Sequence, residues 1–325
     1  MRLADLTTIG LGGEAQVHVV DTLAGVPEAL REHPDARILA GGSNVVIADA
    51  GVPECVLLMR ARGWQQHADQ FIVSAGTPWD DFVAAMVDEG RAGVEALSGI
   101  PGSVGATPIQ NVGAYGQEVA ESIAGMRVLE RATGEVTTWP AERAGFGYRD
   151  STFKRHPADH VVLAVAFDLP VGPSAPIRYA ELARTLGVQV GESVPVAHVR
   201  AAVLDLRRGK GMVLDPADAD TRSVGSFFTN PFVDRVPEGA PGWLQPDGRY
   251  KTSAAWLIEH AGVHKGFRLP GSDVAVSSKH TLALTNRGSG TTQQLLDLAR
   301  EIRGRVEGRF GVRLEPEPVL WGCEL

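Results

Sequence analysis

Three polar residues lie in constrained settings, and each belongs to a type that can move a proton or hold a charge. Ser226 lies between a glycine and two phenylalanines, so its hydroxyl is expected either in a partly dry site or bonded to nearby backbone. Arg149 precedes Asp150, so its role is either that of a catalytic cation or that of a partner in a structural ion pair with this aspartate. Glu317 lies between two prolines, so it is expected to be held in an extended segment. The alternative is an ordinary carboxylate on the protein surface.

Two common hydrolytic chemistries do not fit the sequence. The segment V-G-S-F-F around Ser226 is not the G-x-S-x-G elbow of a serine hydrolase, and no strand–elbow–helix context surrounds it. His260 and His264 are four residues apart, but Gly262 interrupts the helix between them, which argues against a zincin-type site.

No metal site is expected elsewhere either. The chain has 2 cysteines and no C-x-x-C pair, so neither a disulfide framework nor a cysteine-based zinc site is supported. Three isolated histidines are expected at the surface or in packing positions: His18, His67 and His198.

Length and composition indicate the class of molecule. The 325 residues predict two or three compact units, and the hydrophobic content of 44% and charged content of 22% are ordinary for a soluble globular protein. The first residues form no signal-peptide core, and no apolar run reaches the roughly 18 residues of a membrane span, so a cytoplasmic protein is expected.

The formal net charge of −8 argues against non-specific binding to nucleic acid. An anionic substrate therefore needs locally placed cations. The run R-R-G-K that ends at Lys210 is one candidate, although the same run also suits the end of a helix.

The stretch from residue 97 to residue 118, L-S-G-I-P-G-S-V-G-A-T-P-I-Q-N-V-G-A-Y-G-Q-E, is the part of the chain around which the rest is organised. Seven glycines fall between Gly90 and Gly116, and three of them recur at every third residue around Pro101. Such a run forms neither a good helix nor a good strand. A mobile surface loop is one interpretation, but the apolar side chains and the scarcity of charge favour backbone wrapped around a large ligand.

A second glycine-rich turn, G-G-S-N at residues 41–44, separates short strands expected at 37–40 and 45–48. Successive N–H groups in such a connection can point at one anion, although the same residues also suit an ordinary hairpin. The sequence of residues 10–15, G-L-G-G-E-A, matches the G-x-G-x-x-A fingerprint of dinucleotide-binding folds. We reject that match because no strand precedes it and residues 16–20 alternate like a strand instead of opening a helix.

The elements that must position these turns mix strands with helices. Further strands are expected at residues 71–74, 126–130, 161–167 and 319–321. One helix is expected to open at Thr77-Pro78, with the threonine as its cap, and to end at Gly90; others run up to Gly209 and from 291 to 310. A change in composition places a domain boundary near 200–210. Many short strands interleaved with helices predict an α+β protein.

A series of motifs carries a resemblance to a known family. They are G-G-S-N at 41–44, I-P-G-S-V-G at 100–105, P-I-Q-N-V-G-A-Y-G at 108–116, Y-R-D-S-T-F-K at 148–154, G-S-F-F-T-N-P at 225–231 and L-E-P-E at 314–317. In this order they resemble the UDP-N-acetylenolpyruvoylglucosamine reductase (MurB) family. The segment R-Y-A-E-L at 178–182 is similar to the tyrosine loop of one subtype of that family.

The resemblance implies an α+β flavoenzyme. Its FAD-binding domain is of the vanillyl-alcohol-oxidase (PCMH) type in two subdomains, followed by a C-terminal α+β substrate-binding domain. We expect residues 1–60 with 313–325 to form the first subdomain, 61–203 the second, and 204–312 the substrate-binding domain. The implied reaction is the NADPH-dependent reduction of UDP-N-acetylglucosamine enolpyruvate to UDP-N-acetylmuramate, in peptidoglycan (cell wall) biosynthesis.

The glycine-rich stretches fit a non-covalently bound FAD. A pyrophosphate needs converging N–H groups, and a flat isoalloxazine ring needs residues without Cβ where the chain passes close. The expected FAD-binding residues are Gly41, Gly42, Ser43, Asn44, Gly99, Ile100, Gly102, Ser103, Gly105, Ala106, Gln110, Asn111, Gly113 and Ala114.

In the family, NADPH reduces FAD and departs, and the enolpyruvyl ether takes its place. Hydride from the flavin N5 adds to the terminal vinyl carbon and leaves a carbanion next to the carboxylate, which a cation and hydrogen-bond donors must stabilise. By motif position, Arg149 and a protonated Glu317 are these groups. Ser226 delivers the proton, with help from its neighbours, because an alcohol alone is a poor acid.

The same matching places a further set of residues around the UDP-sugar, where lysines neutralise a pyrophosphate as point charges. Trp243 stands where the family has a stacking tyrosine, and it offers an N–H in place of the O–H. The stretch between Lys210 and Ser226 is longer than the family pattern leads us to expect. The full set is Tyr148, Tyr179, Lys210, Asn230, Trp243 and Lys265.

Two alternatives stay open. An alcohol or lactone oxidase of the same flavin fold often attaches its flavin through a histidine near the first glycine turn, and no histidine lies between His33 and His67. A non-enzymatic nucleotide-binding module would leave Ser226 and Glu317 with structural roles only. The expected partners are the enolpyruvyl sugar nucleotide and NADPH, with no nucleic acid and no membrane, and the protein is expected to be a monomer.

Overall fold

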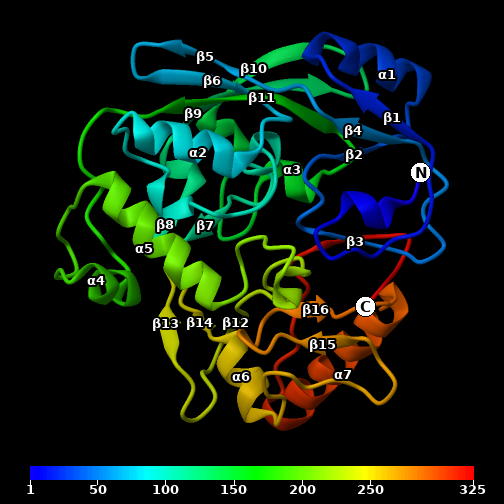
Figure 1. Ribbon diagram of the computed structural model, residues 1–325, viewed down its shortest axis with the longest axis vertical. Helices are drawn as coiled ribbons and strands as arrows, with labels where there is room; N and C mark the ends of the chain where they lie inside the picture. The colour runs from blue at the N-terminus through cyan, green and yellow to red at the C-terminus, as the bar shows by residue number, and fades with distance from the viewer. The chain divides into compact units, whose positions relative to one another are not determined.

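The computed structural model describes residues 1–325, and its contacts divide the chain into two compact units (Figure 1). Unit 1 comprises Met1–Ala15, Gly42–Pro53 and Gly209–Leu325, and unit 2 comprises Gln16–Gly41 and Glu54–Arg208. Each unit is therefore assembled from segments that are distant in sequence. The expected three-part division, with boundaries at 60, 203 and 312, stays a prediction.

Unit 2 is built on a five-stranded antiparallel sheet in the order β10-β9-β11-β6-β5 (Figure 1). Its strands are β5 (Trp64–His67), β6 (Gln70–Ser74), β9 (Ile123–Glu130), β10 (Val136–Pro140) and β11 (His160–Asp168). The central strand β11 is buried along most of its length, which requires a layer on each face of the sheet.

Helix α2 (Trp79–Asp88) covers one face of this sheet. Its buried Phe82 packs against Phe167 of β11, with ring centroids 5.4 Å apart, and against Phe71 of β6. The helix begins where the sequence predicts, but the predicted cap is wrong. Pro78 occupies the cap position, while the Thr77 hydroxyl accepts a hydrogen bond from the Gly63 N–H at 3.0 Å.

The other face carries a three-stranded parallel sheet, β1 (Val17–Val20), β4 (Val56–Met59) and β2 (Arg37–Leu39), with helix α1 (Val26–Glu32) packed on it. The strand β3 (Val45–Ile47) instead pairs in parallel with β17 (Val319–Trp321). Since β2 and β3 belong to different sheets, the turn at residues 41–44 does not close a hairpin.

Unit 2 also holds short elements around the long glycine-rich stretch. They are β7 (Gly113–Ala114), β8 (Gln117–Glu118), α3 (Thr152–Arg155), α4 (Ala180–Leu186) and α5 (Val196–Gly209). Helices α4 and α5 form a small core of their own, in which Leu182 meets Val199 and Val203. Helix α5 ends at Gly209, as the sequence predicts.

Unit 1 is organised around helix α7 (Thr292–Phe310), and its core also includes α6 (Ala254–His260) and the strand pair β15 (Val274–Val276) and β16 (Leu284–Asn286). A second small sheet consists of β12 (Phe232–Val233), β14 (Tyr250–Thr252) and β13 (Gly242–Leu244). Thr291 caps α7 and Gly311 ends it with a φ of 66°, as the sequence predicts. None of the helices combines the length and apolar character that a membrane crossing requires.

A buried carboxylate fixes the segment that leads to Ser226. Asp220 is 3% exposed, and its oxygens accept hydrogen bonds from the Ser278 N–H at 2.9 Å, the Ser278 hydroxyl at 2.6 Å and Arg287 at 2.5 Å. Burial alone raises the pKa of Asp220, but the hydrogen bonds from Ser278 and Ser277 and the Arg287 charge outweigh it and hold the pKa below its ordinary value.

Replacing Asp220 by asparagine is expected to lower the free energy of unfolding by about 3 kcal/mol at pH 7, because Arg287 loses its buried partner. The folded pKa is depressed, so this contribution is present above the unfolded pKa of about 3.9 and is lost as the pH falls through the folded value.

Urea unfolding at neutral and acidic pH measures the difference. The control is Asp297→Asn, since the Asp297–Arg300 pair is nearly half-exposed and contributes little. A wild-type-minus-variant difference for Asp220 that does not shrink in acid would contradict this account.

Candidate functional site

Ser226 and Glu317 lie on neighbouring backbone segments of unit 1. The Glu317 N–H donates to the Phe227 carbonyl at 2.8 Å, and Phe228 and Pro316 form an antiparallel bridge. Both side chains are half-buried. The structure thus brings together two of the three residues expected to act on the substrate, although they are 91 positions apart (317 − 226).

The backbone of Ser226 is held on its other side as well. Ser226 forms an antiparallel bridge with Ala283. The preceding Gly225 has a φ of 76°, a conformation that favours glycine, and its N–H donates to the Ser223 hydroxyl at 3.2 Å. Backbone pairing on both sides therefore fixes the main chain that carries the Ser226 hydroxyl.

Asn44, in the first glycine turn, contacts the same segment. Its side-chain amide donates to the Glu317 carbonyl at 3.4 Å, and its own carbonyl accepts from the Val319 N–H at 3.0 Å, next to the parallel β3–β17 pair. Asn44, Ser226 and Glu317 are consequently parts of one assembly within unit 1.

Close backbone contact explains several of the glycines. A Cβ on Gly41 would lie 2.6 Å from the Cα of Gly102, and one on Gly105 would lie 2.5 Å from the Cβ of Ala75. In unit 1, a Cβ on Gly42 would lie 1.9 Å from the Leu6 carbonyl oxygen. Within unit 2, the first residue of the shorter turn, Gly41, therefore lies directly against Gly102 of the longer turn.

Where these turns meet, several N–H groups have no partner within the protein. No hydrogen bond engages the N–H of Gly41, Ile100, Gly102 or Ser103. Amide groups that are left unpaired in constrained turns and lie close together are suited to bind phosphate oxygens. The residues present therefore fit a ligand that carries a diphosphate.

An ion pair fixes the start of the long turn. Asp80, in the first turn of α2, accepts a hydrogen bond from the Gly99 N–H at 2.6 Å, and Arg200 of α5 donates to both of its oxygens at 2.6 and 3.0 Å. Burial alone raises the pKa of Asp80, but these hydrogen bonds outweigh it, so the pKa lies below its ordinary value. The sequence predicts no role for Asp80, because its partner Arg200 lies 120 positions away in the chain.

Arg149 lies against the other end of the long turn. Its guanidinium donates to the Gly113 carbonyl at 2.5 Å and to the Asn111 carbonyl at 3.4 Å, and its φ of 51° is unusual for a residue with a side chain. Asp150 pairs with Arg155 instead, so the alternative of an Arg149–Asp150 ion pair is wrong. These two carbonyl acceptors fix the orientation of the guanidinium against the long turn.

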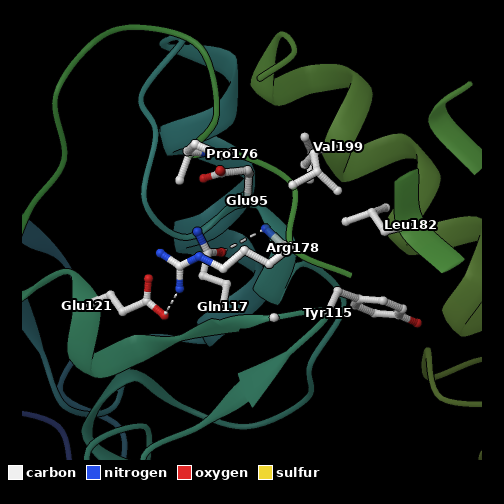
Figure 2. A pocket seen from close by; sticks show the side chains of 12 residues that line it. Glu95, Tyr115, Gln117, Glu121, Pro176, Arg178, Leu182 and Val199 are labelled. Atoms are coloured by element: carbon white, nitrogen blue, oxygen red, sulfur yellow. Dashed lines mark hydrogen bonds and ion pairs between the residues drawn. The ribbon is translucent and has the colours of Figure 1, made fainter. Parts of the chain in front are cut away.

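A small pocket in unit 2 adjoins the predicted tyrosine loop (Figure 2). Figure 2 shows Arg178 pointing toward Glu121, to which it donates a hydrogen bond of 3.2 Å. Tyr115, also lining the pocket, has a φ of 50°, and its ring meets that of Tyr179 edge-on with centroids 5.6 Å apart. Sequence reasoning missed Tyr115, although it lies inside one of the quoted motifs.

Comparison with known proteins identifies the family of this chain. Residues 215–321 match the model described as "UDP-N-acetylenolpyruvoylglucosamine reductase, C-terminal domain", and residues 16–139 match the model described as "FAD binding domain". Curated relatives named UDP-N-acetylenolpyruvoylglucosamine reductase are 53% identical in Salinispora arenicola, over 99% of this chain and 95% of the relative, and 50% identical in Thermobifida fusca, over 99% and 97%. The chain belongs to the UDP-N-acetylenolpyruvoylglucosamine reductase family.

A solved structure of the reductase from Thermus caldophilus matches 99% of this chain and 97% of its own length, with a TM-score of 0.70 and 27% identity. The family and the α+β fold with a flavin-binding domain that the motifs predict are confirmed. The tyrosine-loop subtype stays a prediction.

The remaining expected site residues occupy varied surroundings. Tyr148 lies under the Arg149 guanidinium, 5.4 Å from it, and the Asn230 side-chain oxygen accepts from the Ala254 N–H at 3.0 Å at the start of α6. The others are half-buried or exposed: Ser43, Ala106, Gln110, Ala114, Tyr179, Lys210, Trp243 and Lys265. Their contacts with cofactor or substrate stay predictions.

Replacing Gly41 by alanine is expected to leave the purified protein with a small fraction of its flavin, because the added methyl group would force the two glycine turns apart. The ratio of visible to ultraviolet absorbance measures flavin content. Gly304→Ala is the control, since Gly304 lies in α7 with no atom within 4 Å of the added carbon. Full flavin content in the Gly41 variant would contradict a role of this close contact in flavin binding.

Proposed function

We propose that this protein catalyses the NADPH-dependent reduction of UDP-N-acetylglucosamine enolpyruvate to UDP-N-acetylmuramate through FAD, a step of peptidoglycan synthesis. Identity of about half of all positions with reductases of that name, over nearly the whole chain, carries the proposal. The match of residues 16–139 to a FAD binding domain supports the flavin chemistry. The protein is an oxidoreductase of the UDP-N-acetylmuramate dehydrogenase class.

We assign the binding of the FAD diphosphate to the unpaired N–H groups of Gly41, Ile100, Gly102 and Ser103. No cationic side chain is needed at this site, because the positive ends of the backbone N–H dipoles attract the negatively charged phosphate oxygens. Asp80 keeps the start of this turn in place through the Gly99 N–H. When bound, FAD supplies the hydride that passes from NADPH to the enolpyruvyl group.

Arg149 is assigned to the substrate carboxylate. Hydride addition at the vinyl carbon places negative charge on the carbon next to that carboxylate, and a fixed cation lowers the energy of the resulting enediolate. The hydrogen bonds to the Gly113 and Asn111 carbonyls support this role because they fix the guanidinium before substrate binds.

Ser226 is assigned as the proton donor to the carbanion carbon. A serine hydroxyl is a weak acid, so the alkoxide left behind must be stabilised or reprotonated by a neighbour. Glu317, whose backbone bonds to that of Phe227, is the neighbouring carboxyl group and is assigned as a second donor to the enediolate, which requires it to be protonated.

The remaining substrate contacts follow motif position. Tyr148, Tyr179, Asn230 and Trp243 are assigned to the UDP-sugar, and Lys210 and Lys265 to its diphosphate, which lysines neutralise as point charges. We further propose that the protein acts as a monomer in the cytoplasm, where NADPH and sugar nucleotides are available, without nucleic acid or membrane as partners.

Ser226→Ala is expected to leave the reduction of FAD by NADPH within about twofold of wild type and to slow reoxidation by the enolpyruvyl substrate by about 10²–10⁴-fold, the usual contribution of a positioned acid. Stopped-flow absorbance at the flavin band separates the two half-reactions. Ser289→Ala, at an exposed position, is the control. Equal slowing of both half-reactions would contradict the role given to Ser226.

A further inference from the structure

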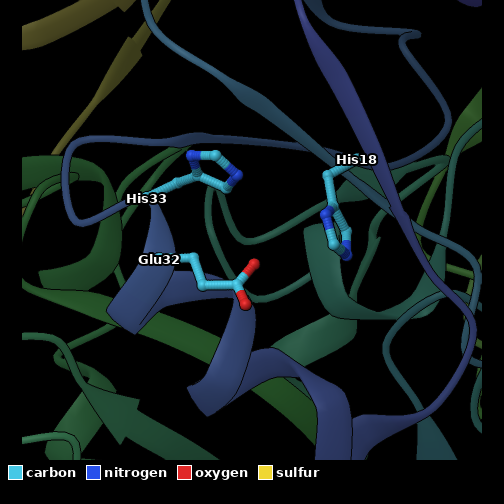
Figure 3. A group of neighbouring side chains, drawn as sticks. All are labelled: His18, Glu32 and His33. Atoms are coloured by element: carbon cyan, nitrogen blue, oxygen red, sulfur yellow. The ribbon is translucent and has the colours of Figure 1, made fainter.

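Two histidines and a glutamate of unit 2 lie together outside every residue assigned above (Figure 3). His18 lies on β1, Glu32 is the last residue of α1 and His33 follows it as the helix cap. One imidazole nitrogen of each histidine and one carboxylate oxygen lie within 4.8 Å of one another. His18, which looks isolated in the sequence, is thus one of three neighbouring ligand-type side chains.

These three side chains are not engaged by the rest of the protein. The rings of His18 and His33 meet edge-on with centroids 6.1 Å apart, but no hydrogen bond or ion pair engages either ring or the Glu32 carboxylate. Figure 3 shows the carboxylate directed toward the space beside the two rings. Their lone pairs are therefore available to a ligand.

We propose that His18, Glu32 and His33 bind one divalent transition-metal ion, with Zn²⁺ the best match. Two imidazoles and one carboxylate are a ligand set that zinc takes with a water in the fourth position, whereas Mg²⁺ and Ca²⁺ prefer oxygen ligands alone. The ion would also offset an unfavourable arrangement, because a carboxylate at a helix C-terminus is repelled by the helix dipole.

The geometry requires only a small adjustment. Ligands about 2.0–2.2 Å from a tetrahedral zinc lie about 3.3–3.6 Å from one another, so the three groups must close by about 1 Å. His18 and Glu32 are exposed, and rotation of their side chains accomplishes this without moving the core. The bound ion would join β1 to the end of α1 and stabilise the folded state by an amount that grows with the logarithm of the free zinc concentration above the dissociation constant.

Equilibrium dialysis of the FAD-loaded full chain against zinc chloride, in a buffer that does not chelate, tests the site. Wild type is expected to hold one ion at a dominant site, and His18→Ala and His33→Ala each weaken it by about tenfold or more. His67→Ala is the matched control, since His67 is an exposed histidine on β5 with no such neighbours, and it is expected to keep the wild-type affinity.

A second readout does not depend on counting ions. Diethyl pyrocarbonate modifies exposed histidines, and mass spectrometry locates the products; zinc is expected to protect His18 and His33 but not His67. Unchanged affinity in the His18 and His33 variants, equal loss in His67→Ala, or several equivalent weak sites would each overturn the proposal. Equal binding of magnesium would overturn the choice of a transition metal.

Discussion

The backbone of Gly41 lies so close to Gly102 that there is no room for a side-chain atom on Gly41. This contact joins two turns that are 61 positions apart (102 − 41), and the N–H groups of Gly41 and Gly102 have no hydrogen-bond partner within the protein. The surrounding layers of unit 2 hold it in place. The helix α2 packs on the five-stranded sheet, and its first turn supplies Asp80, which together with Arg200 fixes Gly99 at the entrance of the longer turn.

Unit 1 uses backbone pairing for a similar purpose. The Ser226 segment bridges to Ala283 on one side, and Phe227 bonds to Glu317 on the other, while Asn44 contacts the Glu317 backbone. The two prolines that flank Glu317 cannot donate to a sheet, which keeps the segment extended without joining a wider ladder. The result is a serine and a carboxyl group whose main chains are fixed.

Local patterns predicted much of this structure. The strands near 71–74, 126–130 and 161–167 and the helix ending at Phe310 occur as expected, because alternation and capping depend on neighbouring residues. The order of short motifs was sufficient to predict the family. By contrast, the Thr77 cap was wrong because its hydroxyl bonds to Gly63, a partner from a different turn.

Contacts between positions that are distant in the chain could not be predicted from the sequence. Asp80 meets Arg200 120 residues away, and β2 and β3 pair with different strands, so the turn at residues 41–44 only resembles a hairpin. Asp150 pairs with Arg155 and not with its neighbour Arg149, whose positive φ no sequence pattern reveals. The cluster around His18 depends likewise on how a strand packs beside a helix end.

We propose above that backbone N–H groups around the contact between Gly41 and Gly102 hold the diphosphate of FAD. Binding of FAD, FMN and riboflavin to the flavin-free protein, followed by flavin fluorescence, tests it most directly. The account predicts that FAD binds more tightly than riboflavin by a factor of about 100 or more, since several charge-assisted hydrogen bonds depend on the phosphates. Equal affinity for FAD and riboflavin would contradict it, because the turns would then contribute nothing to phosphate binding.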